Sequence, residues 1–315
     1  MVPRTGVILA AGRGFRMGEL GREYPKPIMP IYNQPLIVYH LKMFQKLGIK
    51  RVHVIVNYMA SHIAQTIGDY GSFGFEINYI EQNGELLGSA HSLAQVAPYI
   101  DEPFLLVLGD YYFSAPEIGR LMARAESANA SVMAVKREPD RQALCEACAV
   151  ETNSDGRILH IHEKPRFPAT NLKGCGLYAF QPEIFDAVNK TPRTALRNEY
   201  ELTLSLELFI QDGYSVYAED IIEWDVNLTR PADILRCNIA SLELRHQPYL
   251  IGSNTSIPEG SNIGHAVIGK NVIIDHPVSL HRVLVFDESH IDSNERLENV
   301  VITPRAIIPC LNVGE

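Results

Sequence analysis

The sequence has little of what secreted and membrane-spanning proteins need. Its 315 residues include five cysteines, an odd and scattered set that argues against a disulfide framework. No apolar run approaches the length of a membrane span, and the first residues lack the charged, then apolar, then small-residue order of a signal peptide. We therefore expect a cytoplasmic protein that has no membrane partner.

Positive charge is also scarce. The 28 lysines and arginines are outnumbered by 37 aspartates and glutamates, which gives a formal net charge of −9. Because non-specific binding of nucleic acid depends on clustered basic side chains, this balance argues against a nucleic-acid partner. With 46% hydrophobic residues at this length, the chain can form two domains.

What the chain does contain is a glycine-rich turn directly after a short apolar strand. Residues 7–10 read VILA, and Gly12 and Gly14 follow, so the backbone can turn tightly and present amide N–H groups to an anion. The dinucleotide motif needs a third glycine where Met17 stands, and the chain has no Gly-Lys-Ser/Thr of a Walker loop. The plain alternative is a tight turn with surface cations.

Apolar patterning predicts strands that alternate with helices, which is typical of a parallel sheet with ligands at the carboxyl ends of its strands. The predicted strands cover residues 52–56, 75–81, 104–108, 131–136, 147–151, 158–163, 174–180 and 215–218, and the predicted helices cover 35–47, 60–70, 89–97, 200–210 and 231–246. The strand at 104–108 is apolar throughout and leads to Asp110, which can bind a metal or simply cap the next turn.

An aliphatic residue then recurs at every sixth position from Ile251 onward. This spacing is typical of a hexapeptide β-helix in which one side chain on each face points inward. The register slips after Ile263 and fades after Phe286, so we expect a short, imperfect solenoid whose inward side chains include Ile251, Ile257, Ile263, Ile268 and Ile274. We place the boundary between a catalytic domain, 1–247, and this repeat domain, 248–315.

Two segments, LAAGRGFRM at 9–17 and YPKPIMPI at 24–31, resemble the signature of the NDP-sugar pyrophosphorylases, L-A-A-G-x-G-x-R-M/L followed by P-K-P/V. The resemblance implies an α/β fold, with a Rossmann-like nucleotidyltransferase domain, a mixed, mainly parallel sheet and a C-terminal left-handed β-helix. It also implies that an NTP and a sugar 1-phosphate form an NDP-sugar and pyrophosphate, with Mg²⁺ assisting in-line attack on the α-phosphate. No general base is needed, because the attacking phosphate is already ionised.

The resemblance also implies roles at the nucleotide end. Arg16 holds the departing pyrophosphate, Lys26 bridges toward the α-phosphate, and Asp110 binds Mg²⁺. The second metal ligand is Asn227, or Asp225 if the register differs by two residues. The residues expected to hold the nucleotide are Leu9, Ala10, Ala11, Gly12, Gly14, Gln82 or Asn83, Gly88 and Ser89. Ser89 can equally serve as a helix N-cap.

On the sugar side, Glu163 and Lys164 match the family's E-K-P, in which the carboxylate accepts hydrogen bonds from sugar hydroxyls and the lysine meets the sugar phosphate. Gly174 stands where many members have an asparagine that touches the sugar. This departure leaves the sugar open, and the nucleobase is open as well.

Two other functions compete with this interpretation. A catalytically silent NDP-sugar-sensing subunit is expected to have lost one of Arg16, Lys26 or Asp110, and all three are present. An acyltransferase in the β-helix could use one of its histidines, which are His265, His276, His281 and His290. About 65 residues, however, give too few coils for such a site. We favour a packing or oligomerisation role for the repeats and expect a homo-oligomer. Cys145 and Cys148 could begin a zinc site, although two partly buried thiols are the simpler interpretation.

Overall fold

The structure is a computed structural model that describes residues 3–82, 87–195, 197–292 and 296–310. The chain divides into two compact units. The first comprises Met1–Gly12 and His40–Asp225, and the second comprises Arg13–Tyr39 and Val226–Glu315. The boundary that the sequence suggested, at residue 247, lies within the second unit. Within the described part of the chain, no helix is both long and apolar enough to span a bilayer.

The first unit is built on a mixed nine-stranded sheet with the path β10-β9-β11-β6-β1-β4-β5, and with β8 between β11 and β12. Strands β6, β1, β4 and β5 are parallel to one another, whereas β11 runs antiparallel to β6 and to β8. Their bounds are β1 Thr5–Leu9, β4 Arg51–Val56, β5 Glu76–Glu81, β6 Phe104–Leu108, β8 Ser131–Arg137, β9 Cys148–Thr152, β10 Ile158–Glu163, β11 Leu172–Phe180 and β12 Val216–Asp220. The predicted α/β fold with a mixed sheet is confirmed; the sheet was expected to be mainly parallel, whereas the pairs made by β11 and by β9 with β10 are antiparallel.

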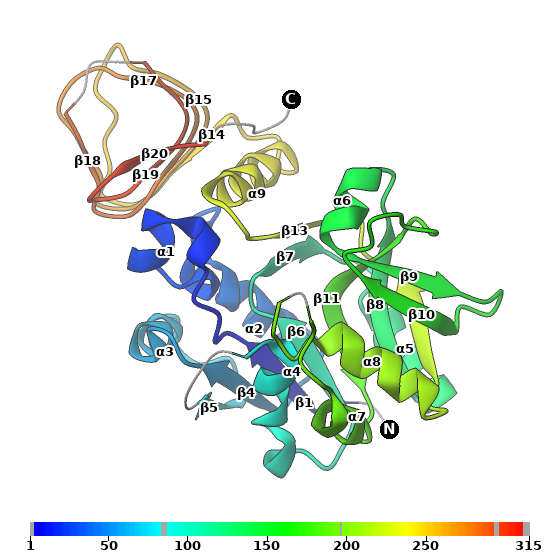
Figure 1. Ribbon diagram of the computed structural model, residues 1–315. Coiled ribbons are helices and arrows are strands. Elements are labelled where there is room, and N and C mark those ends of the chain that lie inside the picture. The colour runs from blue at the N-terminus through cyan, green and yellow to red at the C-terminus, as the bar shows by residue number, and fades with distance from the viewer. Residues whose placement is uncertain (1–2, 83–86, 196, 293–295, 311–315) are drawn as a thin grey trace. The chain divides into compact units, whose positions relative to one another are not determined.

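Helices α4, α7 and α8 pack on one face of this sheet (Figure 1). Phe104 of β6 lies at the centre of that core, 5.7 Å from the ring of Phe180 and 5.4 Å from the ring of Phe185. The helices with residues in this unit are α2 Leu36–Lys46, α3 Ala60–Asp69, α4 Ser89–Ala94, α5 Gly119–Ala128, α6 Arg141–Glu146, α7 Ile184–Lys190 and α8 Leu202–Gln211. Strand β7 (Tyr111–Ser114) follows β6 and pairs with β13 (Trp224–Asn227).

The second unit contains a stack of parallel strands with a fixed step along the chain. Ile251 pairs with Ile268, Ile268 with Val285 and Val285 with Ile302, so each coil takes 17 residues. A step of 17 is one short of three hexapeptides, which explains why the aliphatic spacing drops to five between Ile263 and Ile268. The strands are β14 Tyr249–Ile251, β15 Asn262–Ile268, β16 Ile273–Ile274, β17 Ser279–Val285, β18 His290–Ile291, β19 Arg296–Ile302 and β20 Ile307–Pro309.

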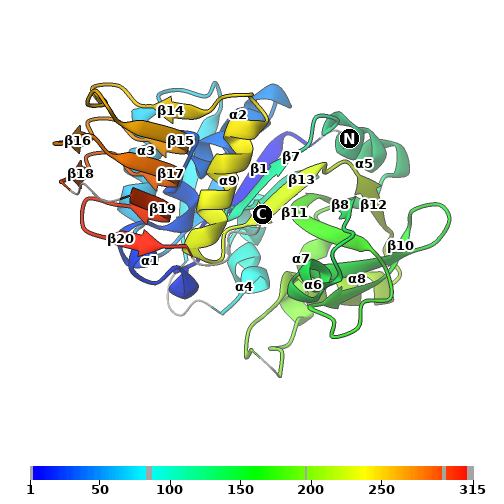
Figure 2. The ribbon, with the colours of Figure 1, turned by 90° about the horizontal axis from the view of Figure 1, so that it is seen from above.

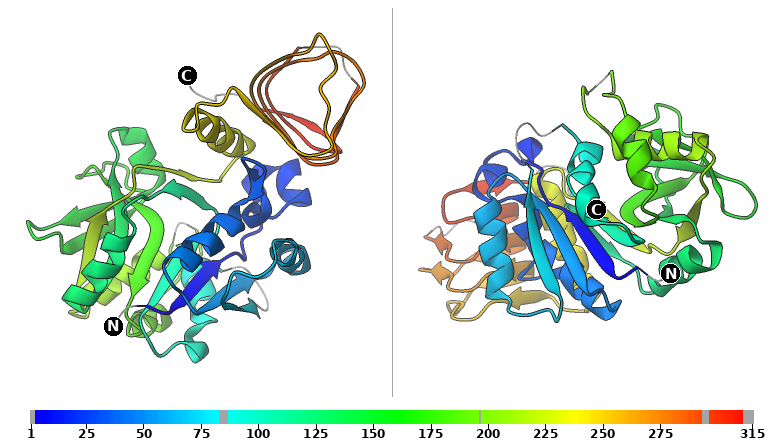
Figure 3. Two further views of the ribbon diagram at one scale, coloured as in Figure 1. Left: turned by 180° about the vertical axis from the view of Figure 1, so that it is seen from behind. Right: turned by 90° about the horizontal axis from the view of Figure 1, so that it is seen from below.

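Figure 3 shows these coils end-on as a closed outline, and Figure 2 shows them from the side with helix α9 (Pro231–Glu243) against the stack. The coils enclose one apolar core. Ile268 and Ile274 are among its members, and Ile251, Ile257 and Ile263 pack against it. All five aliphatic residues that the spacing singled out therefore contribute to the same core.

The same unit holds the segment that follows the glycine-rich turn, with α1 Glu19–Glu23, β2 Pro30–Ile31 and β3 Gln34–Pro35. The Asn33 side chain donates to the carbonyl of Ile268 at 2.7 Å, and the ring of Tyr24 lies 4.8 Å from that of Phe286. The Tyr32 N–H donates to Asn238 of α9 at 2.7 Å. Residues 13–39 are thus held by α9 and by the C-terminal coils.

Replacing Phe286 by alanine tests this support. The ring is 3% exposed, so its removal should lower the free energy of unfolding by about 3 kcal/mol and speed amide exchange in residues 13–39. The measurement is chemical denaturation together with hydrogen exchange. The matched control is Phe167→Ala, because that ring is 79% exposed and its loss should change stability little. If Phe286→Ala leaves the amide exchange of residues 13–39 unchanged, Phe286 does not support this segment.

Candidate active site

The centre of the site is the close approach of two parallel strands at their carboxyl ends. The N–H of Gly109 donates to the carbonyl of Leu9 at 2.9 Å. A Cβ at residue 109 would lie 2.6 Å from that carbonyl oxygen, so only glycine permits the approach. The turn of Ala10 and Ala11, both buried, and the half-buried Asp110 therefore leave the sheet at the same edge.

A buried histidine lies behind Asp110. His40 of α2 is 3% exposed, and its Nε2 is buried without a hydrogen-bond partner in the described part of the chain. Burial lowers the pKa of His40 to about 4, although Asp110 and a hydrogen bond with the backbone of Tyr111 act in the opposite direction. His40 is therefore neutral at physiological pH, so it does not compensate the negative charge of Asp110.

The segment expected to read the base is fixed by its contact with Tyr200. Gly88 has φ 109°, and a Cβ there would lie 2.4 Å from the Tyr200 carbonyl oxygen. The Ala90 N–H donates to the same oxygen at 2.9 Å. Ser89 is the first residue of α4, and its hydroxyl accepts from the N–H of Leu202 at 3.0 Å. Ser89 thus assists the start of α8 and does not cap its own helix.

Gln82 faces into the protein. Its side chain is buried, its Oε1 accepts from the Ser92 hydroxyl at 2.7 Å, and its Nε2 lies 3.0 Å from Nδ1 of His91. The amide is therefore bonded to α4 in this structure. The alternative amide, Asn83, lies outside the described residues.

The sugar-side pair sits where β10 ends. Glu163 is the last residue of β10, and Lys164 follows with φ 47° and donates its N–H to the carbonyl of Ala147 at 2.8 Å. The guanidinium of Arg197 lies 3.2 Å from Glu163 and 3.0 Å from Glu201. Burial, followed by the charge of Glu163, raises the pKa of Glu201. The sequence did not single out Arg197, because 34 residues separate it from Glu163 and no motif links them.

Packing explains the glycine at position 174. A Cβ there would lie 2.1 Å from Cε of Met133 and 2.4 Å from Sγ of Cys148. These two side chains fill the space that an asparagine would need. Burial raises the pKa of the Cys148 thiol to about 12, and all five cysteines of the chain are free thiols. No described group of three or more His, Cys, Asp or Glu side chains is arranged to hold a metal.

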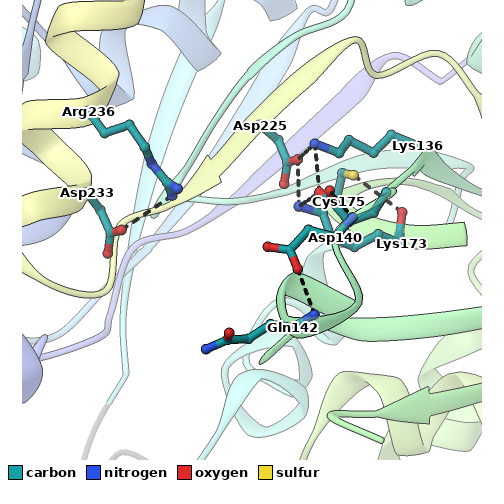
Figure 4. A network of polar contacts seen from close by, with 9 residues as sticks. Lys136, Asp140, Gln142, Lys173, Cys175, Asp225, Asp233 and Arg236 are labelled. Atoms are coloured by element: carbon teal, nitrogen blue, oxygen red, sulfur yellow. Dashed lines mark hydrogen bonds and ion pairs between the residues drawn. The ribbon is translucent and has the colours of Figure 1, made fainter. Parts of the chain in front are cut away.

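The two candidates for the second metal ligand have different environments. Asp225 lies on β13 with a side chain that is 1% exposed, and Lys136 and Lys173 both pair with its Oδ1 (Figure 4). Asn227, two residues further on, is exposed at the end of the same strand. Asp225 therefore has lysine partners already, whereas the Asn227 side chain reaches solvent.

In the second unit, the signature turn brings Gly14 and Lys26 together. Gly14 has φ 64°, a conformation that favours glycine, and a Cβ there would lie 3.2 Å from Cε of Lys26. The lysine side chain therefore runs across this glycine. Gly21 packs against the same turn, since a Cβ on it would lie 2.7 Å from the Gly14 carbonyl oxygen. Arg16 is exposed within the short turn Phe15–Met17.

Residues 5–226 match the family model described as nucleotidyl transferase. The chain belongs to the nucleotidyl transferase family. The predicted membership of the NDP-sugar pyrophosphorylases is confirmed, and with it the prediction of an enzyme of the sugar-1-phosphate nucleotidyltransferase type.

Two relatives and one solved structure illustrate the likeness of this nucleotidyl transferase. It is 32% identical over 227 residues to the UTP–glucose-1-phosphate uridylyltransferase AglF of Haloferax volcanii, covering 72% of this chain and 92% of AglF. It is 29% identical to a glucose-1-phosphate thymidylyltransferase of Streptomyces antibioticus, covering 75% of this chain and 66% of that one. A UDP-glucose pyrophosphorylase solved with UDP-glucose superposes with a TM-score of 0.68 at 18% identity, covering 78% of this chain and all of that one.

The buried His40 predicts an acid-sensitive stability. Its pKa is about 4 in the folded protein and about 6.5 when unfolded, so the unfolded state binds more protons between these values. Folding stability should therefore be complete above pH 6.5 and fall by roughly 3 kcal/mol toward pH 4 through this group alone. In His40→Gln this part of the pH dependence should vanish.

The measurement is guanidinium denaturation at pH 7 and pH 4.5 for the wild type and the variant. His62→Gln, an exposed position on α3, is the control and should keep the wild-type difference between the two pH values. An equal loss of stability in His40→Gln and wild type would show that His40 is not the group responsible.

Proposed function

We propose that this enzyme joins UTP or dTTP to glucose 1-phosphate, releasing pyrophosphate, and that it requires Mg²⁺. The observation that carries the proposal is the pairing of the glycine-turn strand β1 with β6, which puts residues 9–12 and Asp110 at one edge of the sheet. The named relatives transfer uridylyl or thymidylyl groups to glucose 1-phosphate, which supports these substrates over guanylyl and cytidylyl transfer.

The reaction requires the protein to compensate negative charge and to align the two reacting phosphates. An ionised sugar phosphate must approach the α-phosphorus of a highly charged triphosphate in line with the departing pyrophosphate. The backbone of residues 9–12 and Gly14 binds the nucleotide, Arg16 holds the pyrophosphate, and Lys26 compensates the charge of the α-phosphate. Glu163 orients the sugar through its hydroxyls, and Lys164 holds the sugar phosphate.

Asp110 has the properties of a magnesium ligand. It is half-buried at the end of a rigid central strand, offers carboxylate oxygens and lies beside a neutral histidine. Asn227 can supply a second oxygen, since its side chain is exposed. Magnesium bound there would cancel phosphate charge as the α-phosphate bond is exchanged.

We also propose that the 17-residue coils form a left-handed β-helix and that their open end provides the contact surface of a homo-oligomer. Their first task in this structure is to support residues 13–39 through Asn33 and Tyr24. Nothing in this arrangement requires acyl transfer by His265, His276, His281 or His290.

The proposal is tested by measuring pyrophosphate release from each of UTP, dTTP, GTP and CTP against glucose 1-phosphate and mannose 1-phosphate, with Mg²⁺. We expect turnover with UTP or dTTP and glucose 1-phosphate, and its loss in EDTA. Tight binding of UDP-glucose or dTDP-glucose without turnover of any pair would identify a silent sensing subunit. Turnover with GTP or CTP alone would refute the proposed nucleotides.

Asp110→Asn should lower kcat by on the order of 100-fold or more while leaving the fold intact, because the residue follows the strand and is only half-buried. Steady-state kinetics and a thermal melt give the two readouts. Asp101→Asn, at an exposed position before β6, is the matched control and should keep wild-type kinetics. An active Asp110→Asn enzyme with an unchanged magnesium requirement would remove Asp110 from the metal site.

A further inference from the structure

Four charged side chains form a cluster between β8, β11 and β13 (Figure 4). Lys136 of β8 stands directly opposite Lys173 of β11 in the antiparallel pair. Two like charges at facing positions destabilise a sheet unless anions compensate them. Asp225 and Glu138 provide these anions.

The distances show how closely the cluster is paired. Oδ1 of Asp225 lies 2.7 Å from Nζ of Lys173 and 3.1 Å from Nζ of Lys136. Oε2 of Glu138 lies 2.9 Å from Nζ of Lys136 and 3.5 Å from Nζ of Lys173. Each lysine thus contacts both carboxylates, and the two positive and two negative charges sum to zero.

The cluster is also shielded from water. The side chains of Lys136, Lys173, Glu138 and Asp225 are 13%, 10%, 11% and 1% exposed. Both carboxylate oxygens of Asp225 are buried and accept no hydrogen bond from the described residues, so the two lysines compensate its charge as ion pairs through Oδ1. A magnesium ion keeps several of its waters when it binds a protein, so a ligand needs open space beside it. Asp225 has none, and an approaching dication would meet two ammonium groups.

We propose that Asp225 is the counter-ion of Lys136 and Lys173 and not a magnesium ligand, so that a fixed lysine pair carries the positive charge at this end of β13. The inference deepens the proposed function, on which it rests, because it removes Asp225 from the two candidates for the second metal ligand. It also gives Lys173, the neighbour of Gly174, a role as a positioning residue for the strand that leads to Asn227.

The test uses the charge balance of the cluster in the full-length protein. Asp225→Asn leaves one excess positive charge in the cluster, Lys173→Met leaves one excess negative charge, and the double variant is neutral again. Each single variant should melt well below wild type, and the double variant should recover most of the loss, because a buried charge without a partner is costly. Asp220→Asn is the control, since Asp220 pairs with Arg137 on the surface, and it should melt as wild type.

Binding of Mn²⁺, followed by electron paramagnetic resonance in the presence of UTP, gives the second readout. The double variant should bind Mn²⁺ within about threefold of wild type, whereas loss of a true ligand lowers affinity about tenfold or more. Lys173→Met should not tighten Mn²⁺ binding. If Asp225 is instead a metal ligand whose affinity is weakened by the lysines, removing Lys173 must tighten the binding of Mn²⁺.

Three results would overturn the inference. They are a tenfold weaker Mn²⁺ affinity that the double variant does not restore, a tighter affinity in Lys173→Met, and additive melting shifts without recovery in the double variant. Wild-type protein that binds no Mn²⁺ in the presence of UTP would instead count against the proposed function. The melting temperatures of the single and double variants would still show whether Asp225 is the counter-ion of the two lysines. If Asp225→Asn does not fold, Lys173→Met and the double variant carry the test.

Discussion

The hydrogen bond from Gly109 to the carbonyl of Leu9 is the constraint on which the site depends. It closes the parallel pair of β1 and β6 at its carboxyl end, and the 2.6 Å approach leaves no room for a Cβ at residue 109. Two loops of different chemistry then start from neighbouring strands. One is the glycine-rich turn that follows β1, and the other holds Asp110.

Arg16 and Lys26, the two cations of the sequence signature, lie in a segment that other elements hold in place. Arg16 and Lys26 follow the glycine turn in sequence, yet residues 13–39 pack on α9 and on the C-terminal coils through Asn33, Tyr32 and Tyr24. Residues more than 200 positions further along the chain therefore pack against residues 13–39 and hold them in place. This gives the coils a task within the single chain, separate from any role in assembly.

Local patterns predicted the regular elements well. The strand at 104–108 was placed at its observed bounds, and so was the strand at 158–163, because short apolar-rich segments bounded by turn residues are fixed locally. The aliphatic recurrence identified the residues that form the core of the coils, but the step of 17 residues became visible only through strand pairing. The helix predicted to run to residue 246 ends at Glu243.

The site was predictable only where its residues are contiguous in sequence. The glycine turn, Asp110 and the Glu163-Lys164 pair follow strands and could be placed from the sequence. Contacts set by tertiary packing could not. Arg197 reaches Glu163 from a separate loop, and Gln82 bonds to α4. The lysines around Asp225 meet only because β8 and β11 pair in one register.

Transfer of a nucleotidyl group to a sugar phosphate is a reversible displacement, so the reverse reaction tests this function most directly. Radiolabelled pyrophosphate is incubated with the protein, magnesium and UDP-glucose or dTDP-glucose, and label is sought in UTP or dTTP. Label is expected in the triphosphate only when both the NDP-glucose and the metal are present. Binding of the NDP-glucose without any transfer of label to the triphosphate would contradict this function.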